Sequence, residues 1–276
     1  MSVFDQLMDR YIINSEDDRR NALHEVMQHI TLSGLYRAEF FKNAAFYGGT
    51  CLRIFHELPR FSEDMDFSLL KRDEGFTLVP YFEAIKNEFH SLGREVIITR
   101  KEKTRQTNVE SAFLKDNTEI YALKFSSEKK VKIKIEVDVN PPLGFETEQK
   151  LLLQPYSFMT RCFTLPYLFA GKMHALIFRK WQGRVKGRDW FDFEWYAKKN
   201  IPLNLNHFLA RVQQFKSLDI EDFTPEDFKK LLNEKIISTN IDQVIADVRP
   251  FVKNQQDLDI WSTDYFVQLV SFLKFE

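Results

Sequence analysis

The fold is decided by two stretches, Phe46-Tyr47-Gly48-Gly49-Thr50-Cys51-Leu52-Arg53 and Arg60-Phe61-Ser62-Glu63-Asp64-Met65-Asp66-Phe67. They predict a strand, a tight glycine turn, a helix, a loop and a second strand. Residues two apart on a strand point to the same face, so Asp64 and Asp66 face outward together, about 6.6 Å apart at Cα. Two carboxylates at that range repel by roughly 2 kcal/mol at an effective dielectric of about 20. A bound cation would relieve this repulsion.

The glycine turn supplies what a phosphate needs beside such a cation. Oxygen ligands suit Mg²⁺ or Mn²⁺. A turn without side chains lets backbone N–H groups approach a phosphate, and the following helix points its positive end at it. Either Thr50 or the amides after Gly49 would hold a phosphate. Arg53 and Arg60 lie near the turn, where one could pair with a carboxylate and the other could clamp phosphates; the sequence leaves open which does so.

A later strand offers a third carboxylate. Residues 131–139 alternate between apolar side chains and Lys132, Lys134, Glu136 and Asp138. This period of two predicts a half-buried strand with one polar face. Glu136 and Asp138 share that face, and both are candidates to complete a metal site. The alternative is a solvated face on which the lysines balance the acids.

This ordered combination resembles the nucleotidyltransferase superfamily, and more narrowly the AbiEii toxin family. The resemblance rests on Gly48, Gly49, Thr50, Leu52, Arg53, Arg60, Ser62, Asp64, Asp66 and Phe67. It implies that three carboxylates hold two divalent cations for the transfer of a nucleoside monophosphate from a nucleoside triphosphate. It favours Asp138 as the third ligand, with Glu136 close behind.

A second segment extends the resemblance into the C-terminal half. It contains Lys172, Ala175, Leu176, Arg184, Arg188, Asp189 and Asp192. The resemblance implies that Lys172 contacts the nucleotide phosphates and that Asp189 is a catalytic or metal-organising acid, with Arg188 and Asp192 as further candidates. Between residues 171 and 199, eight Lys or Arg residues stand against three acids, which suits triphosphate or RNA. The competing interpretation is a solvated helix face with an Arg188–Asp192 pair.

The rest of the chain sets the organisation. A helical pattern covers residues 17–42, with Gly34 as a candidate break, and a hairpin is expected around residues 115–117. Residues 143–160 read as a connector with some strand character, and from residue 166 onward the pattern is helical. Aromatic residues between 181 and 196 indicate a helix-bundle core rather than a base-stacking platform. The fold class expected is α/β: a nucleotidyltransferase-like mixed sheet with flanking helices in residues 1–160, and a C-terminal helical bundle in residues 161–276.

Bulk properties limit the classes of function. The 276 residues carry a net charge of −1, so any attraction for nucleic acid must be local. Cys51 and Cys162 have no metal-ligand spacing and are expected to be buried thiols in a reducing cytoplasm. Neither a signal peptide nor an apolar run long enough to cross a membrane is visible.

The resemblance implies an enzyme that releases pyrophosphate and transfers the nucleotide to RNA, with the 3′ end of tRNA as the acceptor. In that family the enzyme is the toxin of a toxin–antitoxin or phage-defence pair, so a separate antitoxin protein is an expected partner. Two other classes stay open: a nucleotidyltransferase that modifies a protein or a small molecule, and a catalytically inactive binding module of the same fold. The presence of all the expected carboxylates argues against the inactive module.

Overall fold

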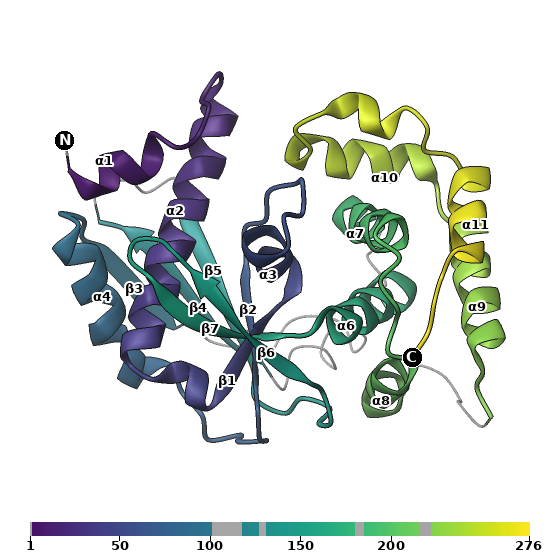
Figure 1. The fold of residues 1–276 in the computed structure, drawn as a ribbon, viewed down its shortest axis with the longest axis horizontal. Helices are drawn as coiled ribbons and strands as arrows, with labels where there is room; N and C mark the ends of the chain where they lie inside the picture. Colours follow the sequence, from purple (N-terminus) through teal and green to yellow (C-terminus); the bar gives the residue numbers. More distant parts are fainter. Residues whose placement is uncertain (1, 101–117, 127–130, 180–184, 216–221) are drawn as a thin grey trace. The chain divides into compact units, whose positions relative to one another are not determined.

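The computed structural model describes residues 2–100, 118–126, 131–179, 185–215 and 222–276 (Figure 1). The chain divides into two compact units. The first comprises Met1–Glu57, Phe61–Pro141 and Thr147–Cys162, and the second comprises Leu58–Arg60, Pro142–Glu146 and Phe163–Glu276. The chain passes from the first unit to the second for the last time after Cys162, two residues after the expected boundary at residue 160. The sequence did not indicate that the two short segments, 58–60 and 142–146, belong to the second unit.

The first unit is built on a mixed sheet of seven strands in its described part, in the order β3-β4-β5-β2-β1-β7-β6. The strands are β1 (Ala44–Tyr47), β2 (Met65–Leu69), β3 (Val96–Arg100), β4 (Thr118–Phe125), β5 (Lys132–Asp138), β6 (Thr147–Leu152) and β7 (Phe158–Phe163). β4 is antiparallel to both β3 and β5, and β1 is antiparallel to β2. β2 runs parallel to β5, and β1 runs parallel to β7.

Helices flank this sheet: α1 (Val3–Met8), α2 (Glu16–Arg37), α3 (Gly48–Phe55) and α4 (Phe82–Ser91), with short 3-10 turns at Phe40–Lys42 and Val79–Tyr81. The hydroxyl of Ser15 caps α2 by accepting a hydrogen bond from the N–H of Asp18. The expected break at Gly34 is wrong, because α2 continues to Arg37. A Cβ at Gly34 would lie 2.6 Å from the Cα of Ile85, so this glycine lets α2 approach α4 closely.

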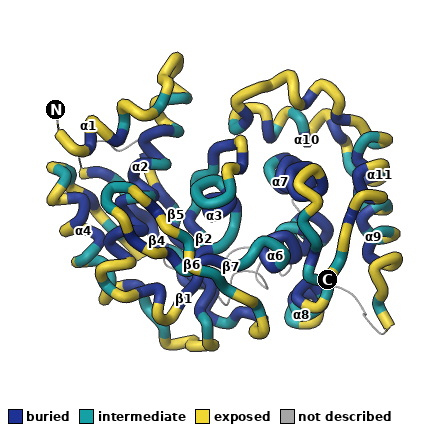
Figure 2. Tube along the Cα trace, in the orientation of Figure 1, coloured by how far each residue is buried: buried dark blue, intermediate teal, exposed yellow. Residues whose placement is uncertain are grey.

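The core of the first unit is rich in phenylalanine. The rings of Phe46 and Phe67 stack with their centroids 5.0 Å apart, and Phe40 meets Phe67 edge-on at 5.1 Å. The apolar face of β5 is fully buried at Ile133 and Ile135, as its alternation predicted. Figure 2 shows buried stretches along the strands of this sheet. Burying one such side chain contributes about 1.5–3 kcal/mol. This packing fixes β1, β2 and β5, the three strands that carry the glycine turn and the acidic residues.

The region 143–160 is more regular than expected, because it forms β6 and the first half of β7. The sequence of β6, Thr-Glu-Gln-Lys-Leu-Leu, hides the strand, since its side chains give no clean alternation of apolar and polar residues. The hairpin expected around residues 115–117 lies outside the described residues. Cys51 and Cys162 are buried free cysteines, as expected.

The second unit is helical where it is described. It contains α6 (Leu165–Phe178), α7 (Gly187–Lys198), α8 (Leu205–Phe215), α9 (Pro225–Ile237), α10 (Ile241–Val248) and α11 (Thr263–Ser271). Aromatic rings fill its core; for example, Trp190 meets Phe266 edge-on at 5.0 Å. The interpretation of these aromatics as bundle core is therefore confirmed for the described residues. No helix within the described ranges combines the length and apolarity needed to cross a bilayer.

Candidate functional site

The glycine turn contacts the aspartate strand directly. β1 and β2 pair so that Tyr47 lies opposite Asp66. Gly48 has a φ of +82°, in the left-handed region, and a Cβ placed on it would lie 2.2 Å from the Oδ2 atom of Asp66. Both the backbone conformation and the lack of space therefore require glycine here. The consequence is a main-chain turn with N–H groups beside a carboxylate.

Thr50 fastens this turn to the loop before β2. Its hydroxyl donates a hydrogen bond to the main-chain oxygen of Asp64, and its side chain is fully buried. The Thr50 hydroxyl is thus occupied by the protein itself. Of the two alternatives left by the sequence, phosphate binding by the backbone N–H groups at the start of α3 fits this arrangement better.

The register between β2 and β5 arranges the acidic residues. Asp66 pairs with Glu136, and Ser68 pairs with Asp138. Residues in register on parallel strands face the same side of a sheet, so Glu136 lies next to Asp66 while Asp138 lies one pleat further along. Asp138 is 8% exposed, and its Oδ1 atom accepts a hydrogen bond of 3.1 Å from the N–H of Asn140. Glu136 is therefore the nearer third carboxylate.

One lysine lies among these acids. Lys134 forms an ion pair with Glu136. Burial works against its charge, yet the carboxylates of Glu136, Asp64 and Asp66 together raise the pKa of Lys134 above its ordinary value. Three carboxylates around one ammonium leave an excess of two negative charges, which attracts cations.

The donor set suits a hard divalent cation, because all its atoms are carboxylate oxygens. The side chain of Asp64 is half-buried and makes no hydrogen bond or ion pair within the described parts of the chain. Among the described residues, however, no three His, Cys, Asp or Glu side chains are gathered closely enough to form a finished metal site. The residues present fit the chemistry of Mg²⁺ or Mn²⁺ without being closed around an ion.

Both arginines that follow the glycine turn in the sequence are paired with carboxylates. Arg53 binds Glu25, with 2.7 Å between Nε and Oε2, and its guanidinium lies 4.8 Å from the centre of the Phe61 ring. Arg60 belongs to the second unit and is 1% exposed. A guanidinium this deeply buried cannot reach a phosphate in solvent. Of the two roles considered for Arg60, pairing with a carboxylate therefore applies.

A buried network of charges lies in the second unit. Asp192 accepts two hydrogen bonds from Arg60, at 2.7 and 2.6 Å, and its Oδ2 atom lies 2.7 Å from the Nζ atom of Lys172. The side chain of Asp192 is 0% exposed, and ten of the twelve residues of α7 are buried. The alternative of a solvated helix face is therefore wrong. Arg188 places its guanidinium 4.2 Å from the centre of the Phe251 ring.

Asp189 extends this network. Its carboxylate lies 3.5 Å from Lys172 and 3.4 Å from Arg179. Burial alone would raise the pKa of Asp189, but Lys172, Lys186, Arg179 and Arg60 hold that pKa well below its usual range. Burial, with help from the neighbouring cations, lowers the pKa of Lys186 to about 8 even though Asp189 opposes the shift.

The balance of the network is positive. Arg60, Lys172, Arg179 and Lys186 are four cations against the two acids Asp189 and Asp192, an excess of two positive charges. Sequence reasoning had not singled out Lys134 or Lys186 as site residues. The sequence could have indicated both. Lys134 shares the polar face of its strand with Glu136, and Lys186 stands three residues before Asp189.

Comparisons with known proteins concern the family and the overall fold of this chain. A family model described as "Nucleotidyl transferase AbiEii toxin, Type IV TA system" matches residues 30–268, which include both motifs. MenT4, the nucleotidyltransferase toxin Rv2826c from Mycobacterium tuberculosis H37Rv, superposes with a TM-score of 0.62 at 14% identity over 97% of this chain and 88% of that one. JHP933 from Helicobacter pylori gives 0.50 at 17% identity over 93% and 89%. Among proteins with curated descriptions, none matches this chain. The two structures support the α/β fold predicted from the sequence.

Proposed function

This chain belongs to the AbiEii family of nucleotidyltransferase toxins of type IV toxin–antitoxin systems, and we propose that it transfers a nucleoside monophosphate from a nucleoside triphosphate to RNA, with the 3′ end of tRNA as the acceptor. The observation that carries this proposal is the contact between the Gly48 turn and the carboxylate of Asp66. It joins a turn suited to phosphate with acids suited to a cation. Phosphoryl transfer depends mainly on positioning and on neutralising charge, and this arrangement offers both.

Asp64, Asp66 and Glu136 would hold Mg²⁺ or Mn²⁺, and Asp138 is the alternative third ligand. A divalent cation bound there would stabilise negative charge on the transferred phosphoryl group. The register of β2 and β5 supports Glu136, and the resemblance to the family supports Asp138. Lys134 would neutralise the same carboxylates when no metal ion is bound.

The phosphates would meet main-chain N–H groups at the start of α3, where the helix dipole adds to their attraction. The positive excess around Lys172 and Lys186 supports a role for the second unit in binding triphosphate or RNA. Asp189 and Asp192 would act as positioning residues that hold the ammonium of Lys172 in place. Family membership also suggests an antitoxin protein as a partner.

The direct test is to incubate the full chain with each labelled nucleoside triphosphate, Mg²⁺ and total RNA. Label on RNA that depends on Asp64 supports the proposal, and the Asp64→Ala variant is the control. Label on protein instead would indicate the class that modifies a protein. No label from any of the four triphosphates, for wild type and variant alike, would favour a binding module without activity.

A further inference from the structure

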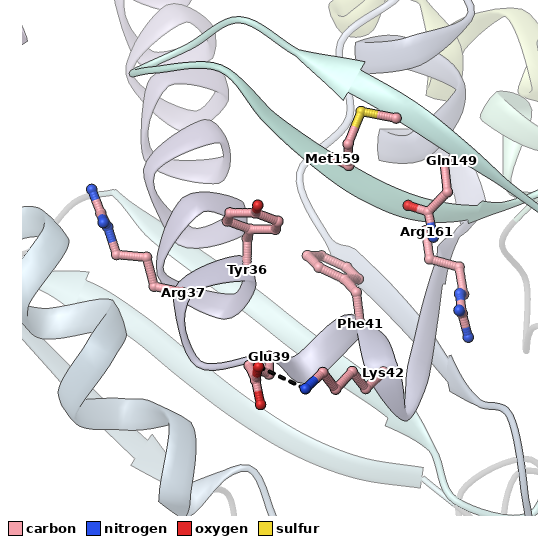
Figure 3. Close-up of a pocket in the computed structure, with 8 residues that line it drawn as sticks. All are labelled: Tyr36, Arg37, Glu39, Phe41, Lys42, Gln149, Met159 and Arg161. Atoms are coloured by element: carbon pink, nitrogen blue, oxygen red, sulfur yellow. Dashed lines mark ion pairs between the residues drawn. The ribbon is translucent and has the colours of Figure 1, made fainter.

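A cavity of about 660 Å³ lies in the first unit, at the opposite end of β1 from the glycine turn (Figure 3). Its walls come from the end of α2, from the segment before β1 and from β6 and β7. A volume of this size is typical of sites that hold a nucleotide-sized ligand. None of the residues that the family resemblance singled out lines it.

The lining carries more positive than negative charge. Arg37, Lys42 and Arg161 stand against Glu39, an excess of two positive charges on a chain whose net charge is −1. Lys42 pairs with Glu39 at 2.6 Å, and Arg37 pairs with Glu88 outside the cavity. Arg161 forms no ion pair or hydrogen bond with any residue that the structure describes. Its charge is available to a ligand.

Apolar side chains are exposed beside these cations. Tyr36 is 42% exposed and Met159 is 39% exposed. The Tyr36 ring packs against Phe158 with 5.4 Å between centroids, which holds the ring in place at the cavity. Exposed aromatic rings bind unpaired bases by stacking, and a methionine sulfur makes favourable contacts with aromatic rings.

The spread of the cations favours a strand over a single nucleotide. Figure 3 shows Arg37 and Arg161 on opposite sides of the lining, with Tyr36 and Met159 between them. A free nucleotide needs cations that converge on one phosphate group, whereas a strand meets them one after another along its backbone. The segment from Lys42 to Gly48 spans at most roughly 20 Å, the length of a fully extended chain. A strand bound in the cavity could extend over that distance to the glycine turn.

We propose that this cavity binds an unpaired segment of the acceptor RNA. A base would lie against Tyr36 and Met159, and backbone phosphates would meet Arg161 and the neighbouring cations Arg37 and Lys42. The identity of the strand as the acceptor rests on the proposed function. The binding itself does not, because it requires neither nucleoside triphosphate nor transfer.

The test measures binding of a fluorescently labelled tRNA transcript to the full chain by anisotropy, without nucleoside triphosphate. Arg161→Glu should weaken binding about tenfold or more and lower the slope of log K against log salt by about one, because one phosphate contact is lost. Tyr36→Ala should weaken binding about tenfold with little change in that slope. The matched control is Lys86→Glu, the same change of charge at an exposed position of α4 outside the cavity, which should bind as wild type does. Arg161→Lys should retain most of the affinity.

The outcomes separate this inference from the proposed function. If wild type labels RNA and Arg161→Glu binds tRNA as tightly as Lys86→Glu, the cavity proposal is overturned while the proposed function stands. If wild type labels no RNA but Arg161→Glu still loses affinity relative to Lys86→Glu, the cavity proposal stands and the proposed function does not. A third measurement compares binding of AMP. If Arg161→Glu loses affinity for AMP and for tRNA equally, the cavity is a mononucleotide site and the proposal of an RNA strand is overturned.

Discussion

Replacing Asp192 by asparagine should destabilise the second unit by about 4 kcal/mol. The side chains of Arg60 and Asp192 are 2% and 0% exposed, and Lys172 is 14% exposed. Asparagine keeps the volume but removes the charge that the buried Arg60 and the partly buried Lys172 share. Removing one partner of a buried ion pair costs about 3–5 kcal/mol, because water cannot reach the remaining charge to replace the lost partner.

Tryptophan fluorescence during urea unfolding measures this loss. All four tryptophans, Trp181, Trp190, Trp195 and Trp261, follow residue 162 and therefore report on the second unit. With a slope of about 2 kcal/mol per molar urea, the midpoint should fall by about 2 M. The control is Glu226→Gln, which removes a surface ion pair with Lys229 in the same unit and should cost less than about 1 kcal/mol.

A double variant sharpens the test. Arg60→Leu combined with Asp192→Leu removes both charges, so it should be more stable than Asp192→Asn alone. A midpoint for Asp192→Asn within about 0.3 M of the Glu226→Gln midpoint would refute the argument that loss of the Asp192 charge leaves buried positive charge uncompensated.

Three further changes are informative. Gly48→Ala should abolish nucleotide transfer and destabilise the first unit. The control is Gly93→Ala, because Gly93 also has a positive φ, +72°, but nothing lies within 4 Å of its Cβ position, so this variant should keep full activity. Equal loss of activity in both variants would refute the argument that a Cβ at Gly48 clashes with Asp66. Glu136→Gln should slow transfer at least tenfold more than Asp138→Asn, and the reverse order in a radiolabel assay would make Asp138 the ligand. The pKa of Lys186 is lowered from an ordinary 10.5 to about 8 in the folded protein. Between these two pH values the folded state therefore binds fewer protons than the unfolded state. The free energy of unfolding should rise as the pH increases from about 8 toward 10.5. Urea midpoints of Lys186→Met should lack that rise, and the same rise in the variant would exclude Lys186 as its source.

Much of the first unit follows from local sequence patterns. The period of two in residues 131–139 placed β5, and the glycine pair followed by Asp64 and Asp66 placed the turn and β2. Patterns of this kind act over a few residues, so their physical cause is visible in the sequence itself. The partner of Asp66 was not visible in this way. Whether Glu136 or Asp138 lies beside it depends on the register of two strands that are about 70 residues apart in the sequence, and that register is set by packing of the whole sheet.

The second motif shows the same limit. The sequence placed Arg188 and Asp192 one helical turn apart, and such spacing favours a local pair. The structure instead joins Asp192 to Arg60, 132 residues earlier. No periodicity reports a contact at that separation. Gly34 misled for a related reason, since its lack of a side chain serves a neighbouring helix rather than a break in its own.

The anchoring of Arg60 has a practical consequence for anyone who dissects this protein. Residues 58–60 leave the α/β unit between α3 and β2, and the chain returns to it at Phe61. A recombinant fragment ending at residue 160 would carry the guanidinium of Arg60 without Asp192, and a fragment starting at residue 161 would carry Asp192 without that arginine. Cutting the gene at the apparent domain border would thus separate Arg60 from its carboxylate partner Asp192. Co-expression of the two halves would be the better route to a working protein.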